Sequence, residues 1–438
     1  MSRKHIVFSG FMLFSLFFGA GNLIFPPLLG LEAGTSFTAA MFGFLLTGVL
    51  LPFMAIIAVA LSDDGLISMG SRVHPVFGVL FAIIIYMSIG AFYGIPRASN
   101  VAYELGFRQV IGADNWAVLL VFSIIFFGVT YFISFNPTKI VDRIGQILTP
   151  LLLFVLAVLF VQAFWKFDNT AGQPAGEYAD ASLVTGFLEG YFTMDAVAAL
   201  AFGIVVINGL KDKGAKTKKE LVKGSLGAAV LAGIALMVVY VSLGWIGRVI
   251  PGDTVYTNGA EILTDAAQML FIQGGSLLFG VIVMLACLTT CVGLINACSR
   301  FFNQIFPRYS YKVYATIFVL IGLIVSNLGL DIILDIATPL LVFIYPIAIV
   351  LILLSLLQQV FGASPLMYRL PVAITAVYAF YEVFASLSFE IGWLKQAIGF
   401  VPFFEEGLGW VVPAVLLAVI GYVIDYTRNE TEGQKRSA

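Results

Sequence analysis

The 438-residue sequence is poor in charge and has no long polar block. Only 11% of its residues are Asp, Glu, Lys or Arg, whereas 60% are hydrophobic; an ordinary soluble domain is roughly 25% charged. A soluble fold of this size could not bury so much apolar surface, and no composition shift marks off a soluble domain. The sequence therefore predicts one integral membrane domain that covers 1–438.

Several functional classes lack the residues that they need. There is no G-x-x-x-x-G-K-[ST] phosphate loop, so ATP is excluded as the direct energy source, and no basic stripe with interleaved aromatics suggests nucleic acid. The three cysteines, Cys287, Cys291 and Cys298, lie in one apolar segment, with neither of the two histidines near them. We interpret them as small packing residues. Because no nucleophile–histidine arrangement or metal-ligand cluster is apparent, we predict neither an enzyme nor a bound cofactor.

Apolar runs of about 20 residues, the length that crosses a bilayer, recur along the chain. The runs are continuous rather than alternating, and backbone groups in hydrocarbon need internal partners, so they predict helices and not barrel strands. The predicted fold is all-α, with twelve transmembrane helices near 6–30, 36–61, 75–102, 116–135, 142–165, 182–209, 221–247, 271–298, 312–328, 331–357, 370–388 and 408–426.

Basic residues in the loops predict the orientation of these spans. If the N-terminus is cytoplasmic, most of the 23 lysines and arginines fall in inside segments, Lys139, Lys213 and Lys216 among them. Such a bias fits an even number of spans with both termini in the cytoplasm. The loop at 210–223, "LKDKGAKTKKELVK", carries much of it, and we interpret that loop as a solvated charge run with only this topological role.

An internal repeat divides the chain. Residues 142–154 read "DRIGQILTPLLLF" and residues 331–343 read "DIILDIATPLLVF". The copies open the fifth and the tenth predicted spans, which run in opposite directions. This predicts a five-helix unit at 6–165 repeated with inverted topology at 182–357, a known transporter plan, with two further helices at 370–426.

The first span and its predicted repeat partner, the sixth, are both interrupted by residues that fit poorly in a membrane helix. Residues 14–27 read "FSLFFGAGNLIFPP", and residues 189–195, inside an equally apolar run, read "EGYFTMD". An unwound stretch frees carbonyls for a cation, and the half-helix that follows presents a partly positive N-terminus to a carboxylate. Paired interruptions favour a midplane binding site over a packing kink.

Two other polar features allow more than one interpretation. In the eighth span, Thr289 and Thr290 lie one turn after Ala286; their hydroxyls are either hard ligands for Na⁺ or bonded back to their own helix. In the third span, Arg97 is either a snorkelling anchor or the partner of an acidic residue.

Four stretches together resemble the bacterial branched-chain amino-acid:cation symporter family (BrnQ/LIVCS), and the resemblance spans nearly the whole chain. They are "GFMLFSLFFGAGNLIFPPLLG", "FYGIPRASNVAYE", "GYFTMDAVAALAFG" and "TPLLVFIYPIAIVLILL". The resemblance implies the leucine-transporter fold of the amino acid–polyamine–organocation superfamily. It also implies uptake of leucine, isoleucine and valine through the bacterial plasma membrane, coupled to Na⁺ or H⁺, with no obligatory protein partner evident.

The resemblance also implies the site residues. "GAGN" looks like the segment whose amides hold the substrate carboxylate, and "YFTMD" looks like the segment that accepts the substrate ammonium. Asp195 stands where many proteins of this fold have a small polar residue; it could bind the ammonium, replace a second cation or take up protons. The expected substrate-binding residues are Gly19, Ala20, Gly21, Asn22, Tyr93, Phe192, Thr193, Met194 and Asp195.

The A-x-x-T-T pattern of the eighth span resembles the sodium site shared across the superfamily. The expected Na⁺ ligands are Ala286, Thr289 and Thr290, with carbonyls near Ser15 and Phe18. A carrier of another small substrate, such as a nucleobase or a polyamine, and a channel remain as alternatives. An inverted repeat with discontinuous helices favours a carrier over a channel.

Overall fold

All the regular secondary structure in the described part of the chain is helical. The computed structural model describes residues 3–62, 65–111, 115–135, 140–168, 170–212, 217–252, 254–271, 273–362 and 364–437. The all-α prediction is confirmed for these ranges. Lys139, Lys213 and Lys216, which contribute to the predicted orientation, lie outside them.

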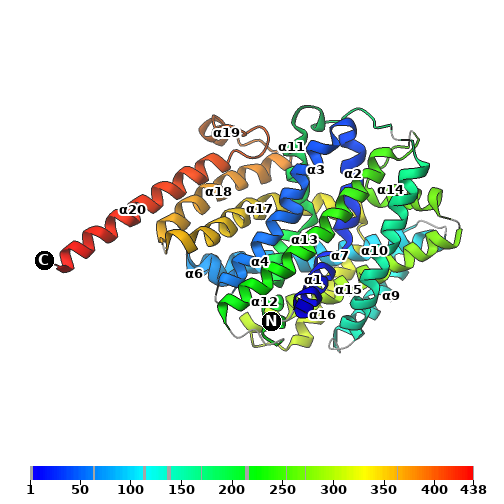
Figure 1. Ribbon diagram of the computed structural model, residues 1–438, viewed down its shortest axis with the longest axis horizontal. Helices are drawn as coiled ribbons and strands as arrows, with labels where there is room; N and C mark the ends of the chain where they lie inside the picture. The colour runs from blue at the N-terminus through cyan, green and yellow to red at the C-terminus, as the bar shows by residue number, and fades with distance from the viewer. Residues whose placement is uncertain are drawn as a thin grey trace. The chain divides into compact units, whose positions relative to one another are not determined.

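Each predicted span coincides with one helix or with a run of consecutive helices (Figure 1). In chain order these helices are α1 (Arg3–Phe17), α2 (Ala20–Ala33), α3 (Phe37–Leu45), α4 (Leu51–Leu61), α6 (Pro75–Met87), α7 (Gly94–Ala102), α8 (Arg108–Ile111), α9 (Trp116–Phe135), α10 (Ile140–Lys166), α11 (Tyr178–Glu189), α12 (Asp195–Asp212), α13 (Lys218–Val249), α15 (Gln273–Ile305), α16 (Tyr311–Ser326), α17 (Leu330–Phe361), α18 (Pro365–Ser386) and α20 (Val411–Ser437).

Length and composition identify the helices that can cross a membrane. Within the described ranges, seven are long and apolar enough, or eight if the bent pair Tyr178–Thr193 and Asp195–Gly203 forms one span. Two more, Pro150–Lys166 and Tyr311–Ser326, are apolar but shorter. The protein is therefore a multi-pass membrane protein.

Three short helices lie between the predicted spans, where the sequence predicts loops. They are α5 (Gly65–Ser71), α14 (Gly259–Leu270) and α19 (Gly392–Ile398). In α14 the buried residues Ala260, Leu263 and Ala267 recur at helical spacing. A short amphipathic helix buries only one face, so its sequence does not contain the continuous apolar run that was used to predict spans.

The third span continues past its predicted end at residue 102. Helical structure extends through a π-helical segment at Tyr103–Phe107 into α8. Glu104 and Arg108, which follow the predicted end, are charged, but they form an ion pair of 2.6 Å one turn apart. Such a pair is compatible with continued helix.

The described chain forms two compact units, neither continuous in sequence. The first comprises Met1–Leu50, Tyr86–Ala198 and Gly227–Ala337; the second comprises Leu51–Ile85, Ala199–Leu226 and Thr338–Ala438. These boundaries do not follow those of the predicted repeats, which divide the chain by sequence order rather than by compactness. All the predicted site residues belong to the first unit.

Small residues let helices of the first unit approach closely. α2 packs against α14, where a β-carbon on Gly259 would collide with the carbonyl oxygen of Ile24. On α13, a β-carbon on Gly247 would likewise collide with the carbonyl oxygen of Pro27. Close backbone contact of this kind is typical of helix packing in membranes, where small residues line the interface.

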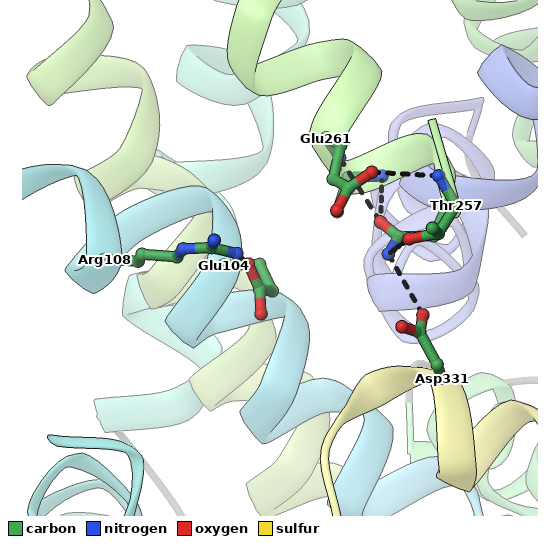
Figure 2. A network of polar contacts seen from close by, with 7 residues as sticks. Glu104, Arg108, Thr257, Glu261 and Asp331 are labelled. Atoms are coloured by element: carbon green, nitrogen blue, oxygen red, sulfur yellow. Dashed lines mark hydrogen bonds and ion pairs between the residues drawn. The ribbon is translucent and has the colours of Figure 1, made fainter. Parts of the chain in front are cut away.

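A polar network fixes the start of α14 (Figure 2). The Asn258 side chain accepts hydrogen bonds from the N–H groups of Ala260 and Glu261, at 3.0 and 3.3 Å, and its amide donates to Asp331 at 3.2 Å. Glu261 in turn accepts from the N–H of Thr257 at 2.9 Å. Asn258 therefore caps α14 and links it to the first turn of α17.

In the second unit, α18 lies alongside α20 (Figure 1). Asp425 of α20 accepts hydrogen bonds from the hydroxyl of Ser364 and the N–H of Leu366, at 2.6 and 2.7 Å. On another face, Arg72 donates to the hydroxyl of Tyr368 at 2.8 Å. The two contacts of Asp425 satisfy donors at the start of α18, which would otherwise lack partners.

Candidate functional site

The helix of the first predicted span is interrupted at Phe18 and Gly19. α1 ends just before Phe18, and α2 begins just after Gly19. Gly19 has an extended backbone (φ −131°, ψ −162°), and its N–H donates to the side-chain oxygen of Asn22 at 2.9 Å. The predicted residues Ala20, Gly21 and Asn22 thus form the first turn of α2, the partly positive end of that helix.

The helix of the sixth predicted span is interrupted at Met194. A 3-10 turn at Gly190–Thr193 follows α11, and α12 begins at Asp195. Met194 has left-handed backbone angles (φ 68°, ψ 7°), which cost a residue other than glycine on the order of 1 kcal/mol. The helical segments on either side are bent by 42° relative to each other. Backbone strain of this kind collects at functional sites.

Side-chain hydrogen bonds join the two interruptions. The Asn22 amide donates to both carboxylate oxygens of Asp195, at 3.1 and 2.9 Å. The hydroxyl of Tyr240, on α13, donates to the same carboxylate and accepts from Asn22. All three side chains are buried. The first turns of α2 and α12 are therefore tied together around one carboxylate.

A buried guanidinium lies beside this cluster. Arg97 donates from Nη1 to the carbonyl of Phe192 at 2.6 Å and to the hydroxyl of Tyr93 at 2.7 Å, and from Nη2 to the carbonyl of Thr193 at 3.2 Å. The Tyr93 hydroxyl itself donates to the Phe192 carbonyl at 3.1 Å. Tyr93, predicted as a substrate-binding residue, therefore contacts the backbone just before Met194, at the second interruption.

The structure contradicts one of the two sequence-based interpretations of Arg97, the snorkelling anchor. The residue is only 5% exposed, so it does not snorkel to an interface. The ion pairs found among the described residues do not include it, but its charge interacts with the buried carboxylate of Asp195 from beyond ion-pair distance. Its guanidinium instead satisfies carbonyls that the turn at Gly190–Thr193 leaves outside a regular helix, a partner that sequence position alone does not reveal.

The predicted cation ligands gather where α15 passes the first interruption. Thr290 donates its hydroxyl to the carbonyl of Ala286 at 3.0 Å and lies 3.5 Å from the carbonyl of Phe18. Thr289 donates to the same Ala286 carbonyl at 2.8 Å. Both threonines are thus bonded back to their own helix, and one also faces the interruption. The hydroxyl of Ser15 donates to Met12 within α1 at 2.8 Å.

Aromatic and apolar side chains surround these polar groups. The rings of Phe25 and Phe192 lie 5.8 Å apart, and Met194 is 3% exposed. Phe18 stacks on Phe14 at 5.1 Å. A small number of polar groups among apolar side chains is typical of a site that binds a small molecule.

Sequence reasoning missed Tyr240 and the contacts of Arg97. Tyr240 stands in the apolar stretch "LMVVYVSLGW", where a tyrosine carries no signal of its own. Asn22 and Asp195 were identified because amide and carboxylate groups are rare inside apolar runs. The sequence did offer one sign of the contact between Arg97 and Tyr93: the two residues are four positions apart, which is one helical turn.

Sequence comparison identifies related proteins over nearly the whole chain. A model of the family described as "Branched-chain amino acid transport protein" matches residues 2–428. The branched-chain amino acid permease BrnQ of Corynebacterium glutamicum is 44% identical over 429 residues, which cover 98% of this chain and 97% of the relative. The permease BraB of Bacillus subtilis is 39% identical over 424 residues, covering 96% and 95% of the two chains.

Solved transporter structures share the fold at low sequence identity. Mhp1, a nucleobase-cation-symport-1 family transporter solved in a closed conformation with bromovinylhydantoin bound, has a TM-score of 0.64 at 13% identity and covers 97% of this chain and 93% of its own. MhsT in complex with L-phenylalanine has a TM-score of 0.55 at 16% identity, covering 97% and 98%. At such identities the likeness is one of fold.

Proposed function

Since the chain belongs to the branched-chain amino acid transport protein family, we propose that it carries leucine, isoleucine and valine across the bacterial plasma membrane without altering them chemically. The names of its permease relatives support this substrate class. The structural observation that carries the proposal is the joining of two helix interruptions through Asn22 and Asp195. This arrangement places helix ends and bare carbonyls around one buried point, as a carrier of a zwitterion requires.

The proposed architecture is the leucine-transporter fold. It has twelve spans, two inverted repeats at 6–165 and 182–357, two additional helices at 370–426, and discontinuous first and sixth spans. The two T-P-L-L copies support it, since each places a proline in the early part of a long helix, Pro150 in α10 and Pro339 in α17. The likeness to Mhp1 and MhsT supports it too. Both termini would be cytoplasmic.

In the proposed site, the substrate lies between the two interruptions. The first turn of α2 faces its carboxylate, and the residues at the second interruption face its ammonium and side chain. Asp195 then supplies the negative charge for the ammonium. The proposed substrate-binding residues remain Gly19, Ala20, Gly21, Asn22, Tyr93, Phe192, Thr193, Met194 and Asp195.

We assign the coupling ion to Na⁺, with H⁺ as the alternative. Hydroxyl and carbonyl oxygens are ligands that hard cations take, and Thr289, Thr290 and the carbonyls of Ala286 and Phe18 provide them within one small region. Hydroxyls that donate to a carbonyl keep lone pairs for a cation. Ser15 would contribute through its backbone carbonyl.

Uptake into proteoliposomes tests the proposed function. Labelled leucine should accumulate when an inward Na⁺ gradient is imposed, and an imposed pH gradient should replace it only if protons are the coupling ion. Preloaded unlabelled leucine should accelerate entry of the label, as it does for a carrier and not for a pore. A protein that accumulates no branched-chain amino acid under either gradient is not the proposed symporter.

A further inference from the structure

The guanidinium of Arg97 retains hydrogen-bonding capacity that the described part of the chain does not use. An arginine has five N–H donors. Three hydrogen bonds of Arg97 go to Tyr93, Phe192 and Thr193, two from Nη1 and one from Nη2. Among the described residues, Nε has no hydrogen-bond partner although the side chain is buried. Nε–H and one Nη2–H therefore remain, on neighbouring nitrogens.

The contact with α2 is made by the face of the guanidinium and does not involve Nε. A β-carbon on Gly21 would lie 2.6 Å from Nη1, 2.7 Å from Cζ and 2.7 Å from Nη2. Near-equal distances to these three atoms place Gly21 over the flat face of the guanidinium, not at its edge. The Tyr93 ring, whose centroid is 4.2 Å from Cζ, also packs on the guanidinium. Both contacts fix its orientation.

The buried positive charge of Arg97 favours the binding of an anion next to its guanidinium. A buried cation is costly unless it is paired, and carbonyl and hydroxyl partners supply no negative charge. Asp195 interacts electrostatically with Arg97 but does not lie within ion-pair distance in the described structure, and its oxygens accept from Asn22 and Tyr240. The first turn of α2, at Gly21, adds the positive end of a helix dipole to the guanidinium. Two independent features thus favour the same anion.

We propose that Arg97 binds the carboxylate of the transported amino acid through Nε–H and Nη2–H, and so makes the site specific for α-amino acids over amines and amides. Carboxylates take paired donors on a guanidinium in a bidentate geometry. This inference rests on the proposed function, because it presupposes an amino-acid substrate. A buried cation at Arg97 and a buried anion at Asp195 then match the two charges of a zwitterion.

Ligand discrimination by purified protein tests the proposal. Leucinamide has the side chain and ammonium of leucine but no carboxylate, so we compare the dissociation constants of the two ligands by calorimetry. The wild-type protein should bind leucine at least about tenfold more tightly, since a charge-assisted bidentate contact contributes that much or more. In Arg97→Gln, leucine affinity should fall on the order of tenfold to a hundredfold and leucinamide affinity by less than about threefold.

Arg248→Gln is the matched control. Arg248 also has an Nε without a hydrogen-bond partner among the described residues and packs over an aromatic ring, that of Trp245 at 4.7 Å. It lies on α13, and this ring is not among the groups that Arg97 contacts. This variant should keep the wild-type ratio of the two constants. Arg97→Lys retains the charge without the fork and should give an intermediate ratio, which provides the test if Arg97→Gln does not elute as a folded species.

Three results would overturn the proposal. One is a wild-type protein that binds leucine and leucinamide equally well; another is a folded Arg97 variant with wild-type affinity for both ligands. The third is an equal loss of both ligands, which would make Arg97 only a structural clasp for the carbonyls of Phe192 and Thr193. Failure of the proposed function looks different, because the wild-type protein would then neither bind nor accumulate leucine.

Discussion

Asn22 donates to both carboxylate oxygens of Asp195, although 173 positions separate the two residues in the sequence. Each residue lies in the first turn of a helix that follows an interruption. The amide of Asn22 also orders its own helix start, since its oxygen accepts the N–H of Gly19. One side chain therefore caps α2 and holds the carboxylate at the start of α12. A movement of one interruption must strain or break its link to the other.

The charge of Asp195 should matter more than its hydrogen bonds. Asp195→Asn keeps an acceptor for Tyr240 but removes the charge assigned to the substrate ammonium. We expect kcat/KM for leucine uptake to fall on the order of a hundredfold, because hydrogen bonds to charged groups are the strong ones. Tyr240→Phe keeps the charge and should cost about tenfold. Initial rates in proteoliposomes measure both.

Asp265→Asn provides the control for charge removal, since Asp265 accepts a hydrogen bond from Tyr256 at 3.1 Å on α14 and has no place in the proposed site. It should transport leucine at the wild-type rate. If Asp195→Asn does so as well, the assignment of Asp195 to the ammonium is wrong.

The sequence predicted the helices well because apolar runs of bilayer length leave the backbone little choice. It also singled out Gly19, Asn22 and Asp195, which contrast with their apolar neighbours and lie next to the ends of α1 and α11 in the chain. It could not show that Tyr240 reaches Asp195, because that contact depends on how α13 packs against two other elements. The contacts of Arg97 were missed for the same reason: two of its partners are backbone carbonyls, and every residue has one.

Gly21 should be intolerant of even a methyl group. In Gly21→Ala the new β-carbon would lie 2.6 Å from Nη1 of Arg97, so the guanidinium would have to shift. Overpacking of this degree costs about 1–3 kcal/mol, and we expect leucine affinity to fall by roughly tenfold or more while the protein still folds. Gly128→Ala on α9, where a β-carbon meets nothing within 4 Å, should bind leucine normally. Equal affinities in the two variants would contradict the placement of Gly21 in the site.

Thr290 should set the sodium dependence of uptake. Thr290→Val removes the hydroxyl near the Phe18 carbonyl but keeps the shape of the side chain. We expect the Na⁺ concentration for half-maximal uptake to rise on the order of tenfold, as for loss of one oxygen ligand. Thr130→Val is the matched control, because the hydroxyl of Thr130 also donates to a carbonyl of its own helix, that of Phe126 at 2.7 Å. An unchanged Na⁺ dependence in Thr290→Val would remove the proposed cation site.

Asn258 should stabilise α14 through its cap and through its link to α17. Asn258→Ala removes the acceptor for Ala260 and Glu261 and the donor to Asp331 (Figure 2). Loss of such a cap costs about 1 kcal/mol, so amides in the first turn of α14 should exchange with deuterium roughly fivefold faster. Asn258→Ser retains the cap and loses the donor, and should show a smaller effect.

Asn115→Ala separates this effect from capping in general. Asn115 caps α9 by accepting from the N–H groups of Ala117 and Val118, at 3.1 and 3.0 Å. Its removal should accelerate exchange at the start of α9 and leave α14 unchanged. Because α14 packs on α2 through Gly259 and Ile24, faster exchange in Asn258→Ala should extend to α2. Exchange confined to the first turn of α14 would show that its contact with α2 does not depend on the cap.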